Sequence, residues 1–134
     1  MRPVAILETC LYVDDLEVAE AFYRDVIGLE FYAKVPERHC FFRCGDSMFL
    51  LFNPESTVAP PGSEFPGHGT RGEGHAAFRA TLEEIDAWRD HLNSAGVEIE
   101  REHKWPSGGF SIYFRDPAGN CLEFATPLTW NMQE

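Results

Sequence analysis

The chain has 134 residues, enough for one domain with a sizeable core and too few for several. Its 22 acidic and 11 basic residues give a formal net charge of −11, and such a field repels phosphate backbones and anionic lipid surfaces. We therefore expect neither nucleic acid nor a membrane as a partner, and no apolar run approaches the ~20 residues of a membrane span. Glu8 interrupts the apolar N-terminal run, so we expect no secretory signal but a cytoplasmic protein with four free cysteine thiols.

The first half of the chain predicts a strand, a helix and three further strands. Apolar and β-branched residues over 3–13 indicate the first strand. Asp14 and Asp15 then offer an N-cap for a helix whose apolar positions recur over Leu16–Ile27, and Gly28 ends that helix. Short strands are predicted next, over Leu29–Val35, His39–Cys44 and Ser47–Asn53.

The second half repeats this order after a long loop over residues 54–72, which is rich in proline and glycine. The predicted elements are a strand over His75–Ala80, an amphipathic helix over Leu82–Ala95, and strands over Val97–His103, Phe110–Arg115 and Asn120–Thr126. One unit used twice predicts an α+β fold in which two βαβββ modules in tandem form a curved, barrel-like mixed sheet. We assign the modules to about residues 3–53 and 73–127 of a single domain, 1–134.

Three residues in equivalent places of the two units are candidate metal ligands. Glu8 lies in the first strand of module one, His75 opens the first strand of module two, and Glu123 lies in its last strand. Buried carboxylates need a partner, and a divalent metal would satisfy all three side chains. Simpler interpretations stay open, in which Glu8 faces solvent, His75 is a polar residue at a strand start, and Glu123 pairs with an arginine.

Two motifs resemble the signatures of the vicinal oxygen chelate superfamily. They are Asp15–Leu29, which contains the run AFYRDVIGL, and Tyr113–Glu123, which reads YFRDPAGNCLE. This superfamily comprises glyoxalase I, extradiol dioxygenases, fosfomycin-resistance thiol transferases, methylmalonyl-CoA epimerase and bleomycin-resistance proteins. The resemblance covers about residues 4–127, and its two motifs are specific for the superfamily but not for one reaction.

The resemblance places metal ligands at Glu8, His75 and Glu123, the residues reached above. Two features depart from the family pattern: the first-strand ligand is commonly His or Gln, and Met48–Phe52 contains no fourth ligand. A three-ligand facial set is therefore expected to hold a divalent metal (Mn²⁺, Fe²⁺, Ni²⁺, Mg²⁺ or Zn²⁺). Its oxygen-rich composition favours Mn²⁺, Mg²⁺ or Fe²⁺.

The resemblance also implies residues for catalysis and substrate binding. Tyr113 matches the substrate-side tyrosine of the family and could donate to a substrate oxyanion, although it could equally pack in the core. Glu8 or Glu123 would accept a proton. Arg115 and Arg43 are candidate anion clamps or, alternatively, surface residues that flank turns.

Two connections are expected to close over the substrate. They are the loop over residues 54–72 and the turn that begins at Trp105, which we also assign to substrate binding.

The leading functional hypothesis is a metal-dependent, glyoxalase-like lyase or isomerase, whose small substrate chelates the metal through adjacent oxygens. A first alternative is an extradiol-type dioxygenase, although those enzymes use two His and one carboxylate on Fe²⁺. A second is a metal-free, acidic, drug-binding protein like the bleomycin-resistance members. Fosfomycin thiol transfer has no support, because no basic cluster suits a phosphonate. By resemblance, we expect a homodimer.

Overall fold

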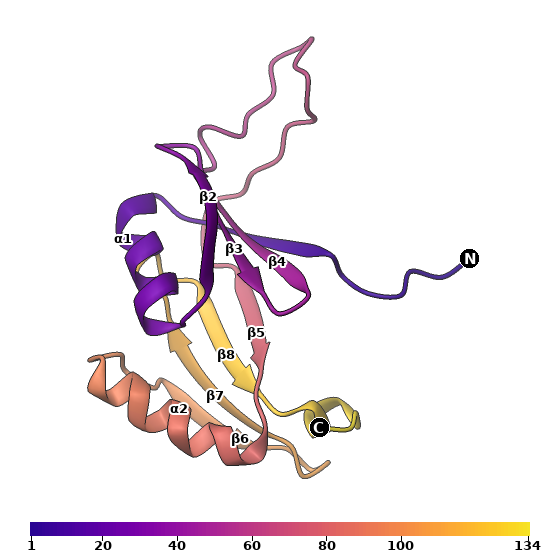
Figure 1. Cartoon of the computed structure of the whole chain (residues 1–134), viewed down its shortest axis with the longest axis vertical. Helices are drawn as coiled ribbons and strands as arrows, with labels where there is room; N and C mark the ends of the chain where they lie inside the picture. The colour runs from indigo at the N-terminus through magenta and orange to yellow at the C-terminus, as the bar shows by residue number, and fades with distance from the viewer. The chain divides into compact units, whose positions relative to one another are not determined.

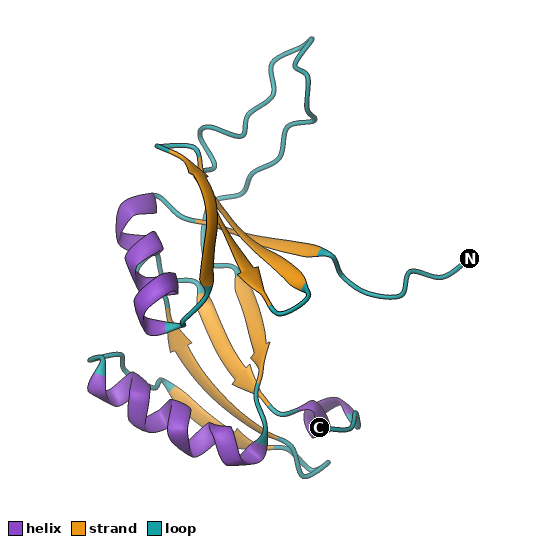
Figure 2. Ribbon diagram, in the orientation of Figure 1, coloured by secondary structure: helices purple, strands orange, loops and turns teal.

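The computed structural model describes all 134 residues, which form two compact units, residues 1–72 and 73–134 (Figure 1). Each unit contains one four-stranded mixed sheet and one main helix (Figure 2). The predicted α+β fold, with two βαβββ modules in tandem, is confirmed. Neither sheet closes into a barrel, because each one ends in two edge strands.

Module one arranges its strands in the order β1-β4-β3-β2. Strand β1 runs parallel to β4, whereas β3 is antiparallel to both β4 and β2. Its elements are β1 (Glu8–Tyr12), α1 (Leu16–Ala21), the π-helical turn η1 (Phe22–Val26), β2 (Glu30–Val35), β3 (His39–Cys44) and β4 (Ser47–Phe52).

The helix of module one begins and ends as its sequence predicts. The Asp15 side chain accepts a hydrogen bond from the Val18 amide at 3.1 Å and so caps α1. Gly28, at a φ of 81°, terminates the helical segment in a conformation that favours glycine. The apolar periodicity does not predict the π-helical turn η1, which follows α1 directly.

The prediction of a strand over residues 3–13 is wrong at its N-terminal end. In the parallel register Glu8 lies beside Met48, and β4 begins at Ser47. At this end of the β1–β4 pair, the final hydrogen bond runs from the Met48 amide to the Leu7 carbonyl at 2.9 Å. Residues before Leu7 have no strand to pair with, so the apolar residues there stay exposed and form no strand.

Module two arranges its strands in the order β5-β8-β7-β6, with β5 parallel to β8. The elements of module two are β5 (His75–Arg79), α2 (Leu82–Ser94), β6 (Arg101–Lys104), β7 (Phe110–Arg115), β8 (Cys121–Ala125) and the 3₁₀ turn η2 (Pro127–Trp130).

No helix in the chain has the length and apolar composition needed to cross a lipid bilayer.

The prediction of a strand over Val97–His103 is also only partly correct. The Val97 amide still bonds to the Leu92 carbonyl at 2.9 Å, which closes the end of α2. The strand β6 itself covers only Arg101–Lys104, where Arg101 lies opposite Tyr113, and the Glu100 amide just before it donates to the Tyr113 carbonyl at 2.8 Å. The residues between the helix and β6 serve as the connection rather than as sheet.

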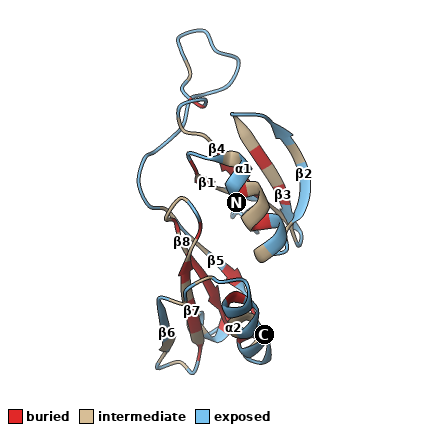
Figure 3. Ribbon diagram, turned by 90° about the vertical axis from the view of Figure 1, so that its left-hand side faces the viewer, coloured by how far each residue is buried: buried red, intermediate tan, exposed pale blue.

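Each sheet buries one face against the helix of its own module. In module two, Leu122 and Phe124 of β8 lie on the α2 side, where the rings of Trp88 and Phe124 stack at 4.0 Å. In module one, the buried Tyr23 ring contacts Phe49 at 5.1 Å. Because side chains alternate along a strand, the residues between these core positions lie on the opposite face. Figure 3 shows that the buried residues of module two follow β7 and β8.

The start of α2 provides a test of local helix stabilisation. The Thr81 hydroxyl accepts from the Glu84 amide at 3.2 Å, and the Glu84 carboxylate accepts from the Thr81 amide at 2.8 Å. Thr81→Ala should lower the free energy of unfolding by about 0.5–2 kcal/mol, because it removes this reciprocal cap. Urea denaturation measures the change. Thr70→Ala, in the exposed loop, is the matched control and should have a smaller effect; equal effects would contradict the assignment.

Candidate active site

His75 and Glu123 lie together in module two, as the sequence predicts for a shared site. In the parallel register His75 pairs with Cys121, and Ala77 pairs with Glu123, so both side chains come from neighbouring strands. The Nε2 atom of His75 is 3.4 Å from Oε2 of Glu123. Glu123 is only 7% exposed, whereas His75 remains accessible to solvent. His75 therefore lies on the solvent-accessible side of a carboxylate that is otherwise buried.

The second nitrogen of His75 determines the chemistry of this pair. Nδ1 donates a hydrogen bond to the Cys121 carbonyl at 2.9 Å, because a carbonyl oxygen can only accept. In the neutral imidazole, the lone pair then lies on Nε2, directed at the carboxylate oxygen of Glu123. Two acceptors that converge in this way are satisfied by a cation between them. A histidine that donates through one nitrogen to a backbone carbonyl is also the usual arrangement of a metal ligand, so the residues fit a metal.

Tyr113 lies directly opposite Glu123 in the β7–β8 pair. Burial, followed by the charge and hydrogen bonding of the Glu123 carboxylate, raises the pKa of Tyr113. The phenol is thus protonated at neutral pH and able to donate a hydrogen bond. Tyr113 is half-buried on the sheet face that carries Glu123, and does not belong to the apolar core on the other face.

The turn before β8 positions His75, a role that our sequence analysis did not assign. The Asp116 carboxylate accepts from the amides of Ala118 and Asn120, each at 2.9 Å, and from the Asn120 side chain at 2.9 Å. The Asn120 side-chain oxygen accepts from the Gly74 amide at 2.7 Å. This bond holds the residue that precedes His75 against the start of β8. The DPAGN run contained the signal, since Asp and Asn side chains commonly bond to nearby backbone amides.

Glu8 belongs to module one, where it is exposed on the sheet face opposite α1. It lines a cavity of about 750 Å³ together with residues from β2, β3, β4 and the loop over residues 54–72. The structure contains no group of three or more His, Cys, Asp or Glu side chains arranged to hold a metal ion. Within module two it brings His75 and Glu123 together, and the participation of Glu8 stays a prediction.

The two arginines assigned to substrate binding have different surroundings. Arg115 donates to both carboxylate oxygens of Glu100, at 2.7 and 3.0 Å, and to Glu73 at 3.2 Å. Arg115 also lowers the pKa of Glu100. Arg43, in contrast, has no carboxylate partner and lies over the Tyr32 ring at 4.7 Å, at the cavity that Glu8 lines. Arg43 is therefore the more available of the two for an anion.

Trp105 is anchored beside the same sheet face as Tyr113. Its Nε1 donates to the Ser111 hydroxyl at 2.8 Å, and its ring meets His103 edge-on at 4.5 Å. Ser111 is two residues before Tyr113 in β7, so their side chains share a face. Contact of Trp105 with substrate stays a prediction.

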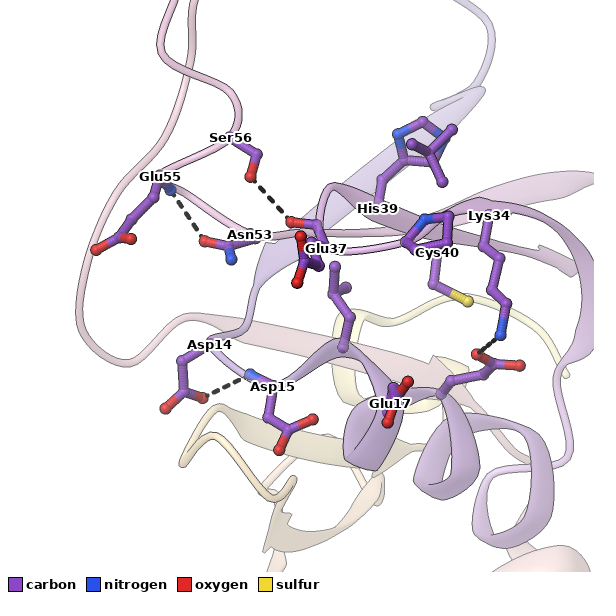
Figure 4. Close-up of a pocket in the computed structure, with 14 residues that line it drawn as sticks. Asp14, Asp15, Glu17, Lys34, Glu37, His39, Cys40, Asn53, Glu55 and Ser56 are labelled. Carbon is purple, nitrogen blue, oxygen red and sulfur yellow. Dashed lines mark hydrogen bonds and ion pairs between the residues drawn. The ribbon is translucent and has the colours of Figure 1, made fainter.

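A second cavity of module one, of about 720 Å³, is strongly acidic (Figure 4). Lys34 is its only basic side chain other than His39, and it pairs with Glu20 at 2.8 Å. Asp15 is occupied in capping α1. The acidic groups of this cavity therefore serve in part to form the helix and to join it to β2. The carboxylates that line it are Asp14, Asp15, Glu17, Glu20, Glu37 and Glu55.

Comparison with known proteins identifies the class. The model of the Glyoxalase/Bleomycin resistance protein/Dioxygenase superfamily matches residues 5–124, and the chain belongs to this superfamily. The resemblance to vicinal oxygen chelate proteins is thereby confirmed. A comparison with curated proteins gave no match.

Solved structures include a close relative. A crystal structure of lactoylglutathione lyase from Agrobacterium tumefaciens is 44% identical, with a TM-score of 0.94 over 98% of this chain and 100% of that chain. A virulence protein from Salmonella typhimurium is 25% identical, with a TM-score of 0.73 over 94% and 98% of the two chains. A mutant of the fosfomycin resistance protein FosX from Listeria monocytogenes, complexed with Mn(II) and 1S,2S-dihydroxypropylphosphonic acid, shares the fold at 22% identity and a TM-score of 0.68, over 92% and 90%.

The positioning role of Asn120 can be tested by Asn120→Ala. This change removes the side-chain hydrogen bonds of Asn120 with the Gly74 amide and with Asp116, so the free energy of unfolding should fall by about 1–3 kcal/mol. Urea denaturation gives the stability, and the imidazole nitrogen resonances of His75 report its displacement. Asn53→Ala, which removes a single bond to the exposed Glu55 amide, is the control and should move neither. Unchanged His75 resonances in Asn120→Ala would refute the role.

Proposed function

We propose that this protein is a metal-dependent enzyme of glyoxalase type, a lyase or isomerase, whose small substrate presents two adjacent oxygens. The observation that carries the proposal is that Nε2 of the exposed His75 and a carboxylate oxygen of the buried Glu123 are only 3.4 Å apart. The 44% identity to a protein named lactoylglutathione lyase supports a lyase over the other reactions of the superfamily.

The proposed metal ligands are His75, Glu123 and Glu8. One imidazole and two carboxylates form an oxygen-rich set that suits Mn²⁺, Fe²⁺ or Mg²⁺. A divalent metal supplies Lewis-acid stabilisation of the negative charge that develops on a substrate oxygen. The manganese complex of the Listeria protein makes Mn²⁺ the first ion to test.

The side chains around the ligands complete the proposed chemistry. One of the two carboxylates, Glu8 or Glu123, accepts the proton that leaves the substrate carbon. Tyr113 stays protonated because its pKa is raised, and its phenol donates a hydrogen bond to a substrate oxygen. The Cys121 carbonyl holds the His75 ring in one tautomer, so Nε2 is the nitrogen offered to the metal.

Metal binding is tested on protein purified with Mn²⁺, Fe²⁺, Ni²⁺ or Zn²⁺ and measured by elemental analysis and calorimetric titration. We expect about one ion per chain. His75→Ala and Glu123→Gln should weaken Mn²⁺ binding by at least the ~10–100-fold that follows loss of a supporting residue at a metal site. Glu98→Gln, an exposed residue of module two, is the matched control.

Two outcomes would overturn the proposal. If the purified protein holds no metal and Glu123→Ala changes neither binding nor activity, the metal-free binding alternative replaces it. If the protein loaded with Fe²⁺ consumes oxygen with a catechol, the ring-cleaving alternative replaces it. Formation of lactoylglutathione from glutathione and methylglyoxal is the first activity to measure, because it follows the name of the 44% identical relative.

A further inference from the structure

The sheet face of module one that lies opposite α1 carries the cavity of about 750 Å³ introduced with Glu8. This volume is in the range of sites for small organic ligands. Half of its lining residues are aromatic, with rings contributed by three strands and by the loop over residues 54–72. The lining rings are those of Tyr32, His39, Phe41, Phe52, Phe65 and His68.

The rings of this cavity pack on one another and leave their remaining faces to the cavity. His39 and Phe41 stack almost in parallel, with centroids 4.1 Å apart and planes inclined by 10°. Phe52 meets Phe41 edge-on at 5.4 Å, and His68 meets Phe52 edge-on at 4.8 Å. His68 is held in place by the Tyr12 hydroxyl at 2.6 Å. Rings fixed in this way form a preorganised wall for a flat apolar group.

The cavity also holds two arginines that lack a carboxylate partner, in a chain with twice as many acidic as basic residues. Arg43 lies over the Tyr32 ring at 4.7 Å, and Arg38 lies over the Phe52 ring at 5.9 Å. Four of the seven other arginines of the chain are paired with carboxylates: Arg24, Arg71, Arg89 and Arg115. A guanidinium held against an aromatic ring keeps N–H groups free for an anion.

His39 adds no positive charge to that of these two arginines. Arg38 donates to His39 Nδ1 at 2.6 Å, so this nitrogen carries no proton. Burial, followed by the charge of Arg38, lowers the pKa of His39, and the imidazole is neutral at pH 7. Arg38 and Arg43 are therefore the permanently charged cations of the lining, and Glu8 is its one carboxylate.

We propose that this cavity binds a small aromatic molecule with an anionic group, its ring against Phe41 and Phe52 and its anion on Arg43 and Arg38. A cationic ligand is disfavoured, since the two guanidinium groups already occupy positions over the rings. The assignment of this ligand class as the substrate class rests on the proposed function. Glu8, a proposed metal ligand, lines the same cavity, so the aromatic acid would also carry the two adjacent oxygens that chelate the metal. Binding of the aromatic acid itself needs no metal.

The test is a calorimetric titration of 2-naphthoate into the full-length protein in the presence of EDTA. We expect saturable binding with one site per chain. Arg43→Gln and Arg38→Gln should each weaken it about tenfold, as expected for loss of one charge-assisted hydrogen bond. Arg24→Gln, which removes an arginine paired with Asp25 outside the cavity, is the matched control and should bind normally.

A ligand series on the unaltered protein keeps the proposal testable even where a variant fails to fold. The neutral 2-naphthamide and the non-aromatic cyclohexanecarboxylate should each bind at least about tenfold more weakly than 2-naphthoate. Equal binding of 2-naphthoate and 2-naphthamide, or no saturable binding of 2-naphthoate, would overturn the proposal. Because this titration is made without metal, failure of Mn²⁺ binding leaves it unchanged, and the two failures are distinguished.

Discussion

Each sheet of this protein packs only one of its two faces against a helix, because each module contributes a single main helix. This constraint separates the core from the site. Along β8, Leu122 and Phe124 enter the core beneath α2, and the alternation of the strand leaves Cys121 and Glu123 on the other face. The same alternation places Tyr113 and Ser111 of β7 on the face that carries Glu123. The polar side chains are thereby kept out of the aromatic core, and that core contains no buried unpaired charge.

The two modules use the same architecture for different chemistry. Module two presents a buried carboxylate beside an imidazole whose tautomer is set by a backbone carbonyl, an arrangement suited to a metal. Module one presents packed rings and two arginines without carboxylate partners, an arrangement suited to a flat anion. Glu8 lies exposed in the first strand of module one, whereas Glu123 lies buried in the last strand of module two. The duplicated unit has thus kept its strand order while the two open faces have diverged.

The successes and failures of the sequence predictions have physical causes. Gly28 and Asp15 marked the limits of the first helical segment correctly, because capping is a local interaction. The strand over residues 3–13 was predicted too long, since its extent depends on where β4 begins, a partner 40 residues away in the register. Likewise, the strand over Val97–His103 was shortened by the hydrogen bond that closes α2. Local signals are readable in a sequence, whereas the length of a strand is decided by its neighbour.

The same division applies to the site. The sequence alone determined the repeated strand–helix–three-strand order and the family, because duplication and motif spacing are properties of the linear chain, and it singled out His75 and Glu123 as candidates. Only the tertiary structure decided that His75 Nδ1 donates to the Cys121 carbonyl, that Arg115 is engaged by Glu100, and that Arg43 is free of carboxylates. Hydrogen-bond partners are chosen by distances of about 3 Å between atoms far apart in sequence. Such distances exist only after the strands have paired.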